Sequence, residues 1–138
     1  MESLLTLASE GTRTPWRVLF EKTLSGLSRR TLRLASGLIL FAYPLHPSGQ
    51  PDKLRDEHLP RIICPVLCMN GTKDDLCNRE LMDSVVSRLP ETFTMHWLEG
   101  ADHSFHVLKR SGRTEEDVYR EIAETSSAWF DRRPARCA

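Results

Sequence analysis

The chain has 138 residues, of which 40% are hydrophobic, and its nineteen basic residues balance nineteen acidic ones. This length suits one domain of modest size, and the composition allows one buried core but not two. The balanced charge gives no overall field that would attract a nucleic acid or an anionic membrane, so we expect neither as a partner.

Residues 1–36 differ in composition from the rest of the chain. Residues 1–37 carry six Arg or Lys against three Glu, whereas the remainder carries thirteen basic against sixteen acidic residues. Thr14 can cap a helix, and Pro15 suits its first position. Apolar residues then recur at roughly helical spacing, at Trp16, Leu19, Phe20, Leu24, Leu27 and Leu34. We predict a basic amphipathic helix within residues 14–35. Its expected place is on the surface with one buried face, and the alternative is a membrane-binding or partner-binding helix.

This first segment also bears on location in the cell. It has no apolar run long enough to span a bilayer, and it lacks the basic start and apolar centre of a secretory signal. We therefore expect an intracellular protein, in the cytoplasm first and in the nucleus as the alternative.

From Gly37 onward, short apolar strands alternate with helices. The predicted strands are GLILFAYPL (37–45), CPVLCMNG (64–71) and TMHWLE (94–99). Helices are predicted at 79–89, capped by Asn78, and from Thr114, where Asp117 completes an imperfect capping box. This order predicts an α/β fold in residues 37–131, with about three parallel strands and flanking helices. Residues 132–138 are expected to form a flexible tail.

The two predicted helices each have an apolar face. On the helix at 79–89, Leu81, Val85 and Leu89 recur, with Met82 and Val86 beside them. The last helix is expected to bury Val118, Ile122 and Trp129, with Tyr119 and Phe130 as neighbours.

Two polar residues follow neighbouring strands. Asp74 comes after the strand at 64–71, and His103 comes after the strand at 94–99. In parallel sheets, chemistry collects beyond the carboxyl ends of the strands. A carboxylate that orients a histidine forms the second half of a Ser, Asp, His relay. Asp74 and His103 are therefore candidates for an acid and a base, and turn or solvated roles are the alternative for each.

Several motifs in chain order resemble the C-terminal half of the α/β-hydrolase family. They are ILFAYPLHPSGQPDKLRDEHLP, PVLCMNGTKDDLC, HWLEGADHSFHVLKRSGRTEEDV and EIAETSSAWF, and together they cover about residues 37–130. The resemblance is to the dienelactone-hydrolase-like branch, which contains testis-expressed protein 30 and relatives of the NSL complex subunit 3. It implies a serine hydrolase of ester or other acyl substrates.

The resemblance also implies roles for particular residues. The family's G-x-x-D loop maps onto Gly71 to Asp74, and its G-x-D-H-S loop places the base at His103. Asp75 is the adjacent competitor for the acid, with a loop or capping role as its alternative. Asp102 is expected to be a turn residue.

The family's nucleophile has no clear counterpart in this sequence. It belongs on a G-x-S-x-G elbow upstream, and the rough candidate around Ser28 reads GLSRR and lies only nine residues before Gly37. A helix and its return loop do not fit in that span, so we expect Ser28 to be a surface helix residue. The expectation is a truncated isoform, gene fragment or incomplete gene model with impaired catalysis.

Other groups are weaker candidates for the missing chemistry. Cys77 could act as a nucleophile if an imidazole lowered its pKa, but Cys64, Cys68 and Cys77 are expected to be buried, reduced thiols. A metal site could gather Asp102, His103 and His106 with His46 or Cys77 as a further ligand, yet no second paired motif supports it. His96 is expected to pack in its strand and His58 to lie in a solvated turn. We expect no metal and no cofactor.

Two functions remain open at this stage. The first is a hydrolase of a small acyl substrate, impaired because the nucleophile elbow is missing. The second is a non-catalytic remnant of the fold that binds a protein partner or itself through an open sheet edge.

Overall fold

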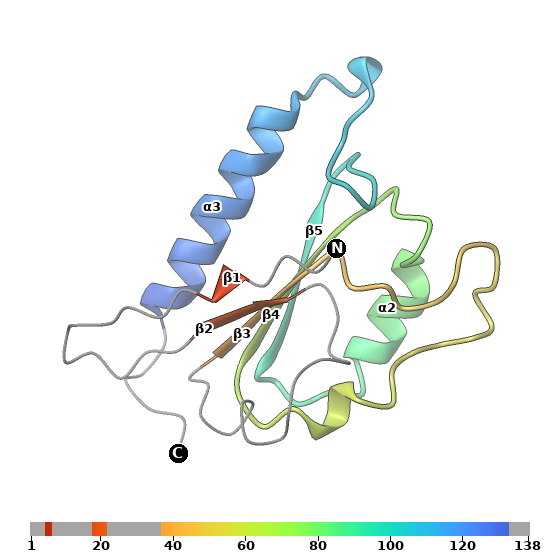
Figure 1. Cartoon of the computed structure of the whole chain (residues 1–138), viewed down its shortest axis with the longest axis vertical. Helices are drawn as coiled ribbons and strands as arrows, with labels where there is room; N and C mark the ends of the chain where they lie inside the picture. Colours follow the sequence, from red (N-terminus) through yellow and green to blue (C-terminus); the bar gives the residue numbers. More distant parts are fainter. Residues whose placement is uncertain (1–4, 7–17, 22–36, 133–138) are drawn as a thin grey trace.

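The computed structural model describes residues 5–6, 18–21 and 37–132, the first two segments as backbone only. Its centre is a five-stranded sheet whose spatial order follows the chain, as Figure 1 shows. The strands are β1 (Leu5–Thr6), β2 (Val18–Glu21), β3 (Gly37–Phe41), β4 (Val66–Gly71) and β5 (Phe93–Leu98). β1 pairs with β2 in the antiparallel sense, and the pairs β2 to β3, β3 to β4 and β4 to β5 are parallel. The three predicted parallel strands are thus confirmed as β3, β4 and β5.

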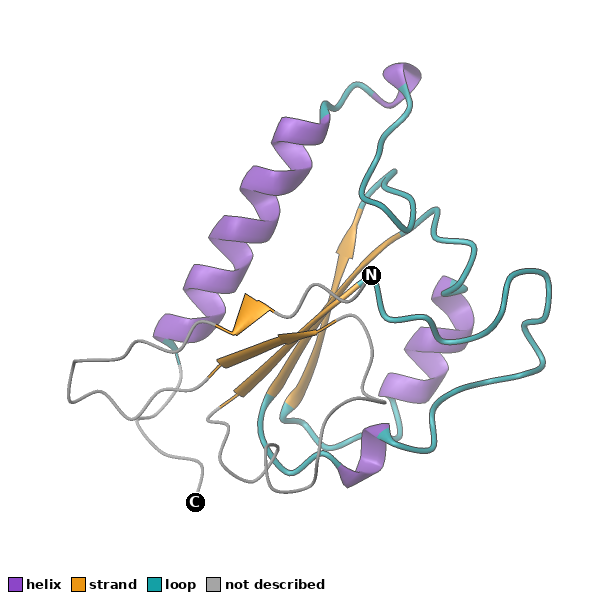
Figure 2. Cartoon of the chain, viewed as in Figure 1, coloured by secondary structure: helices purple, strands orange, loops and turns teal. Residues whose placement is uncertain are grey.

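Helices cover both faces of this sheet, as Figure 2 shows, with α2 (Arg79–Val86) on one side and α3 (Glu115–Asp131) on the other. Two short 3-10 turns, η2 (Leu59–Arg61) and η3 (Lys109–Ser111), lie in the connections. No helix among the described residues is both long enough and apolar enough to cross a bilayer.

Alternation along the strands divides the buried side chains between two cores. Val66 and Cys68 of β4 pack in the same core as Met82 and Val85 of α2. The residues between them, such as Leu67, pack instead with α3, through Val118 and Trp129. Successive strand residues point to opposite faces, so a parallel strand covered on both sides must be apolar throughout. The continuous apolar runs in the sequence have this cause.

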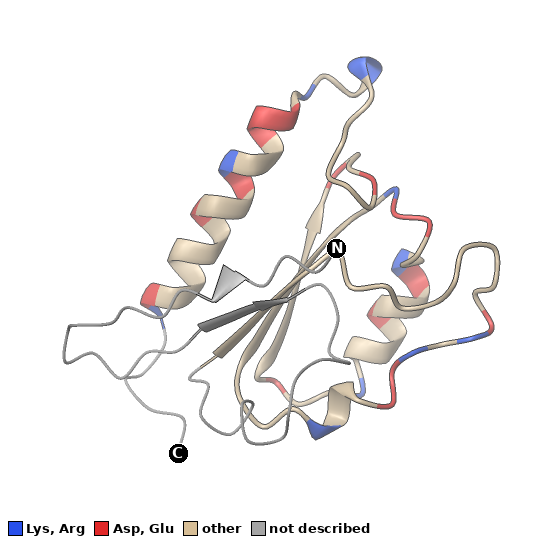
Figure 3. Cartoon of the chain, in the orientation of Figure 1, with Lys and Arg blue, Asp and Glu red and all other residues tan. Residues whose placement is uncertain are grey.

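Both predicted helix starts are confirmed. The Asn78 side chain accepts a hydrogen bond from the Leu81 N–H at 3.0 Å. Thr114 and Asp117 form a complete capping box, with bonds in both directions between side chain and backbone. Acidic residues also gather in the first turn of α3, as Figure 3 shows, where the positive end of the helix dipole stabilises them. Local chemistry therefore sets where these helices begin.

The predicted N-terminal helix is wrong at residues 18–21. These residues form β2, which pairs with β3 in register from Val18 opposite Gly37 to Glu21 opposite Leu40. The remainder of residues 14–35 lies outside the described part of the chain. The apolar spacing of four consecutive residues can fit a helix or a strand equally well. Here the edge of β3 supplies backbone hydrogen-bond partners, which the spacing of apolar residues could not reveal.

The apolar face of α3 is narrower than expected. Val118 and Trp129 are buried and Ile122 packs against them, as predicted. Tyr119, by contrast, is 51% exposed and Phe130 is 37% exposed. Each follows a buried residue by one position, and a step of about 100° around the helix turns it away from the sheet.

Candidate functional site

The loops after β4 and β5 bring Asp74 and His103 into contact. His103 Nδ1 lies 2.9 Å from Asp74 Oδ2 and 3.1 Å from Oδ1. The Asp74 side chain is fully buried, whereas one third of the His103 side chain is exposed. The two residues singled out from the sequence are thus neighbours at the carboxyl edge of the sheet, with the carboxylate inside and the imidazole at the surface.

The acid loop, residues 72–78, holds the Asp74 carboxylate from both sides. Oδ1 accepts a hydrogen bond from the Leu76 N–H at 2.8 Å. Oδ2 accepts one from the Asn70 side-chain amide at 3.3 Å. A buried carboxylate costs free energy unless such donors compensate for its lost hydration. The local turn and the end of β4 supply that compensation here.

The base loop, residues 99–107, is a tight turn stabilised by Asp102. Asp102 Oδ1 accepts hydrogen bonds from the backbone N–H groups of Ser104 at 2.8 Å and His106 at 2.9 Å. Ala101 and Val107 form an isolated antiparallel bridge that closes the loop. Asp102 therefore has the geometry of the turn residue that the sequence predicts, and His103 lies at the tip that this turn creates.

Gly71, the last residue of β4, lies directly against the base loop. A Cβ atom at this position would lie 2.0 Å from the Ala101 carbonyl oxygen, so only glycine fits. The same carbonyl accepts a hydrogen bond from the Lys73 N–H at 2.9 Å, and the Thr72 N–H donates to Leu98 O at 3.1 Å. Backbone contact thus fixes the distance between acid and base.

This arrangement orients the imidazole. The carboxylate contacts place the proton on Nδ1, which leaves the lone pair of Nε2 pointing away from Asp74. Within residues 37–132, no hydrogen bond reaches Nε2, and the ring is partly open to solvent. An imidazole in this arrangement can accept a proton at Nε2, and the Asp74 carboxylate lies beside the Nδ1–H of the imidazolium that would result.

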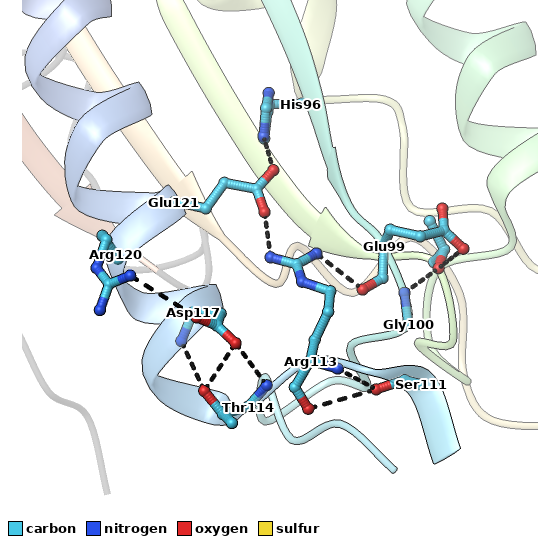
Figure 4. Close-up of polar contacts among 10 residues, drawn as sticks. His96, Glu99, Gly100, Ser111, Arg113, Thr114, Asp117, Arg120 and Glu121 are labelled. Carbon is cyan, nitrogen blue, oxygen red and sulfur yellow. Dashed lines mark hydrogen bonds and ion pairs between the residues drawn. The ribbon is translucent and has the colours of Figure 1, made fainter. Parts of the chain in front are cut away.

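A second polar network anchors the start of the base loop to α3, as Figure 4 shows. Arg113 donates to the Glu99 carbonyl oxygen at 3.0 Å and also pairs with Glu121 of α3. The other oxygen of Glu121 lies 2.8 Å from His96 Nε2 on β5. Burial raises the pKa of Glu121, but the hydrogen bonds from His96 and Arg113 together lower it below its usual value. Predicted only to pack in its strand, His96 thus belongs to an ionic network.

The other residues considered for the site from the sequence do not join the pair of Asp74 and His103 in the described residues. Asp75 is exposed, and the carboxylate that contacts His103 is that of Asp74. His46 is buried and accepts a hydrogen bond from the Asn78 N–H through Nε2 at 3.0 Å, so it ties two loops together. Among the residues that the structure describes, no group of three or more His, Cys, Asp or Glu side chains could hold a metal ion. Ser28 lies outside the described residues.

The predicted buried state of the thiols is confirmed for Cys64, Cys68 and Cys77. Burial, followed by the charge of Asp74, raises the pKa of Cys77 to about 12. Burial likewise raises the pKa of Cys68 well above its ordinary value. The thiolate is the reactive form of cysteine, so these surroundings oppose a nucleophilic role for either residue.

A cavity of about 810 Å³ lies beside the base loop. Its charged lining residues carry both signs, and Asp74 and His103 are not among its lining residues. The charged residues that line the cavity are Lys73, Asp75, Glu99, Asp102, Arg110 and Arg113. The mixed signs give the cavity no clear preference for an anion or a cation.

Sequence reasoning missed Asn70, which is fully buried and contacts Asp74. The available signal was a lone amide in the otherwise apolar strand PVLCMNG, because a buried polar group needs a hydrogen-bond partner. It also missed the contact of Gly71 with Ala101, for which the only signal was a glycine at a strand end.

Comparison with known families adds an independent finding. A family model described as an alpha/beta hydrolase domain matches residues 9–131. The match includes β2 to β5, both helices, and the loops that carry Asp74 and His103. It also begins before Gly37, the residue at which the sequence motifs start.

Proposed function

Because the chain belongs to the alpha/beta hydrolase family, we propose that Asp74 and His103 are the acid and general base for hydrolysis of an ester or another acyl substrate. The observation that carries this proposal is the 2.9 Å contact between His103 Nδ1 and the buried Asp74 Oδ2. The G-x-x-D and G-x-D-H-S motifs further support a place in the dienelactone-hydrolase-like branch, near testis-expressed protein 30 and NSL complex subunit 3.

The proposed chemistry follows from the orientation of the ring. Nε2 of His103 removes a proton from an attacking water molecule, and the water oxygen forms a bond to the acyl carbon. The Asp74 carboxylate stabilises the imidazolium formed in this step. Collapse of the tetrahedral intermediate breaks the bond to the leaving group, which takes the proton back from Nε2.

We further propose that this activity is impaired. The 138 residues contain no G-x-S-x-G motif, so no residue is identified as an activated serine. A general base acting on water retains only part of the catalytic effect, typically about 10²- to 10⁴-fold. We therefore expect slow hydrolysis of activated esters by the chain alone.

The test compares His103→Gln with His58→Gln in an assay of p-nitrophenyl acetate hydrolysis. Both histidines can react nonspecifically with this ester, but His58 is exposed and outside the site, so its variant is the matched control. We expect His103→Gln to reduce the protein-dependent rate by about 10²-fold and His58→Gln to leave it nearly unchanged. Equal rates in the two variants would contradict the proposed base.

A fluorophosphonate probe asks separately whether a serine is activated. We expect no labelling of the wild-type chain, since slow hydrolysis would then use water. Labelling that is lost in Ser28→Ala would instead identify Ser28 as the nucleophile and overturn the proposed impairment.

Partner binding is the second candidate function. It is favoured by four large hydrophobic side chains that are exposed in the described residues, Ile63 at 69%, Leu108 at 60%, Tyr119 at 51% and Phe130 at 37%. Size-exclusion chromatography distinguishes the cases, because a self-associating remnant elutes as an oligomer. If the protein is a monomer and does not hydrolyse esters, binding to a different protein is the version of this second function that remains.

A further inference from the structure

Asn70 is a polar residue inside an apolar core. It is the fifth residue of β4 and is fully buried. Alternation along the strand places it on the face of Val66 and Cys68, which pack against α2. An amide in such a place costs free energy unless hydrogen bonds replace those it makes to water. Its contacts therefore show what it does.

The amide makes all four hydrogen bonds that its side chain allows. Its oxygen accepts from the Tyr43 N–H at 3.1 Å and from the Cys68 thiol at 3.3 Å. Its nitrogen donates to the Tyr43 carbonyl oxygen at 3.0 Å and to Asp74 Oδ2 at 3.3 Å. A flipped amide would set its oxygen against two other acceptors, so the network permits one orientation.

The contact with Tyr43 occurs where β3 leaves the sheet. The last backbone bond from this strand end runs from the Ala42 N–H to Met69 O at 2.8 Å. Ala42 has a φ of 51°, a left-handed conformation that turns the chain away from β4. Asn70 then bonds both backbone groups of Tyr43 in place of a neighbouring strand. The Tyr43 hydroxyl in turn donates to the Arg55 carbonyl oxygen.

We propose that Asn70 is a positioning residue, which fixes the Asp74 carboxylate against His103 and anchors it to the chain at Tyr43. The Leu76 N–H donates to Oδ1 and the Asn70 amide donates to Oδ2. These two hydrogen bonds oppose rotation of the carboxylate about the Cβ–Cγ bond of Asp74. Both oxygens then stay within 3.1 Å of His103 Nδ1. Without Asn70, His103 would be the one remaining hydrogen-bond partner of Oδ2 among the described residues.

The role of Asn70 in catalysis rests on the proposed function, but its effect on His103 can be measured without turnover. Nitrogen NMR of the full chain, labelled at histidine, reports which ring nitrogen carries the proton. We expect wild-type His103 to be almost entirely in the Nδ1–H tautomer. In Asn70→Ala the Nε2–H tautomer should rise to a clearly measurable fraction, because the carboxylate no longer has a fixed orientation.

Val66→Ala is the matched control for this measurement. Val66 lies on the same strand and the same face as Asn70 and is equally buried, but it makes no hydrogen bond to Asp74. The variant loses packing and should keep the wild-type tautomer. Two results would overturn the proposal: a wild-type tautomer in Asn70→Ala, or an equal change in Val66→Ala.

A second set of variants covers the case in which Asn70→Ala fails to fold. Asn70→Asp keeps the shape but sets a second carboxylate against Asp74, so its urea midpoint should fall as the pH rises from 5 to 8. Adding Asp74→Asn restores one amide facing one carboxylate. The double variant should then be more stable at pH 8 than Asn70→Asp alone. If the effects of the two substitutions on stability were strictly additive, the proposed contact between residues 70 and 74 would be contradicted.

These readouts separate this proposal from the proposed hydrolase. If ester hydrolysis is absent but the tautomer shifts in Asn70→Ala, the hydrolase fails and the positioning contact stands. If His103→Gln abolishes hydrolysis but Asn70→Ala keeps the wild-type tautomer, the hydrolase stands and Asn70 has no positioning role.

Discussion

The acid loop and the base loop lie side by side but are stabilised in different ways. Asp74 has a fully buried side chain, fixed by a core amide and a backbone N–H. His103 is one third exposed and sits on a turn whose hydrogen bonds come largely from Asp102. A buried carboxylate needs compensating hydrogen-bond donors, whereas an imidazole must be accessible if it is to exchange protons with another molecule. The site divides these two requirements between two loops.

Their anchors to the rest of the molecule differ in the same way. The acid loop is bound to the segment after β3 through buried His46. Its backbone N–H donates to Leu76 O at 3.0 Å, and its ring Nε2 accepts a hydrogen bond from the Asn78 N–H. The base loop is tied to α3 by the partly exposed pair of Arg113 and Glu121. We therefore expect substitutions on the acid side to cost more stability than comparable ones on the base side.

Gly71→Ala should have the largest effect because it breaks the contact between the loops. The new Cβ would lie 2.0 Å from the Ala101 carbonyl oxygen, which is backbone and cannot move cheaply. Overpacking of this kind costs about 3 kcal/mol. Urea denaturation measures the loss, and the His103 signals should change as well.

Gly112→Ala is the control for that substitution. Gly112 has a φ of 74° but nothing within 4 Å of an added Cβ, so the cost should be limited to backbone strain of about 1 kcal/mol. If Gly71→Ala cost no more than Gly112→Ala, the loops would not be in contact at this point.

His46→Ala tests the anchor of the acid loop. It removes a buried side chain and leaves the partly buried Asn78 N–H without its acceptor, and together these losses should cost about 2 kcal/mol. The free energy of unfolding should fall by this amount, while the same change at exposed His58 should have little effect. If His46→Ala and His58→Ala lowered the free energy of unfolding by similar amounts, His46 would not be the anchor of the acid loop.

Asp102→Ala tests the turn of the base loop. It removes the acceptor for two backbone N–H groups that water can reach, so we expect a loss of about 1 kcal/mol. Asp102→Asn retains an acceptor oxygen and should stay close to the wild type. A loss from Asp102→Ala that exceeded that from His46→Ala would reverse the comparison between the loops.

Glu121→Gln tests the anchor of the base loop and should have the smallest effect, below about 1 kcal/mol, because the ion pair is partly exposed. Hydrogen bonds from His96 and Arg113 lower the Glu121 pKa from its usual 4.5 despite its partial burial. Its contribution is therefore present above pH 4.5 and is lost as the pH falls further. The stability difference between wild type and variant should narrow below pH 4.5, and a constant difference would contradict the pKa shift.

Much of the fold between Gly37 and Asp131 could be predicted because its signals are local. Strands covered on both faces must be apolar, and the caps at Asn78 and Thr114 act within three residues of themselves. β2 could not be predicted in this way. Its four residues are stabilised by pairing with β3, from which residues 22–36 separate them in the sequence, and a helical spacing of apolar residues hid the strand.

The candidate site shows the same limit. Position at strand ends and family resemblance together indicated Asp74 and His103, and their contact is now seen in the structure. Asn70 could not be assigned, because its significance depends on where Ala42 turns the chain toward Tyr43. A hydrogen bond between residues 27 positions apart leaves no periodic trace in the sequence.

The order of the strands also bears on how the chain acquires its structure. Each strand from β1 to β5 is placed beside the one that precedes it in the chain. A ribosome that releases the chain from its N-terminus can thus add strands to a growing edge, with no earlier pair reopened for a later insertion. On that route β4 and Asp74 emerge before β5 and His103, so the contact between Asp74 and His103 can form only after β5 has joined the sheet.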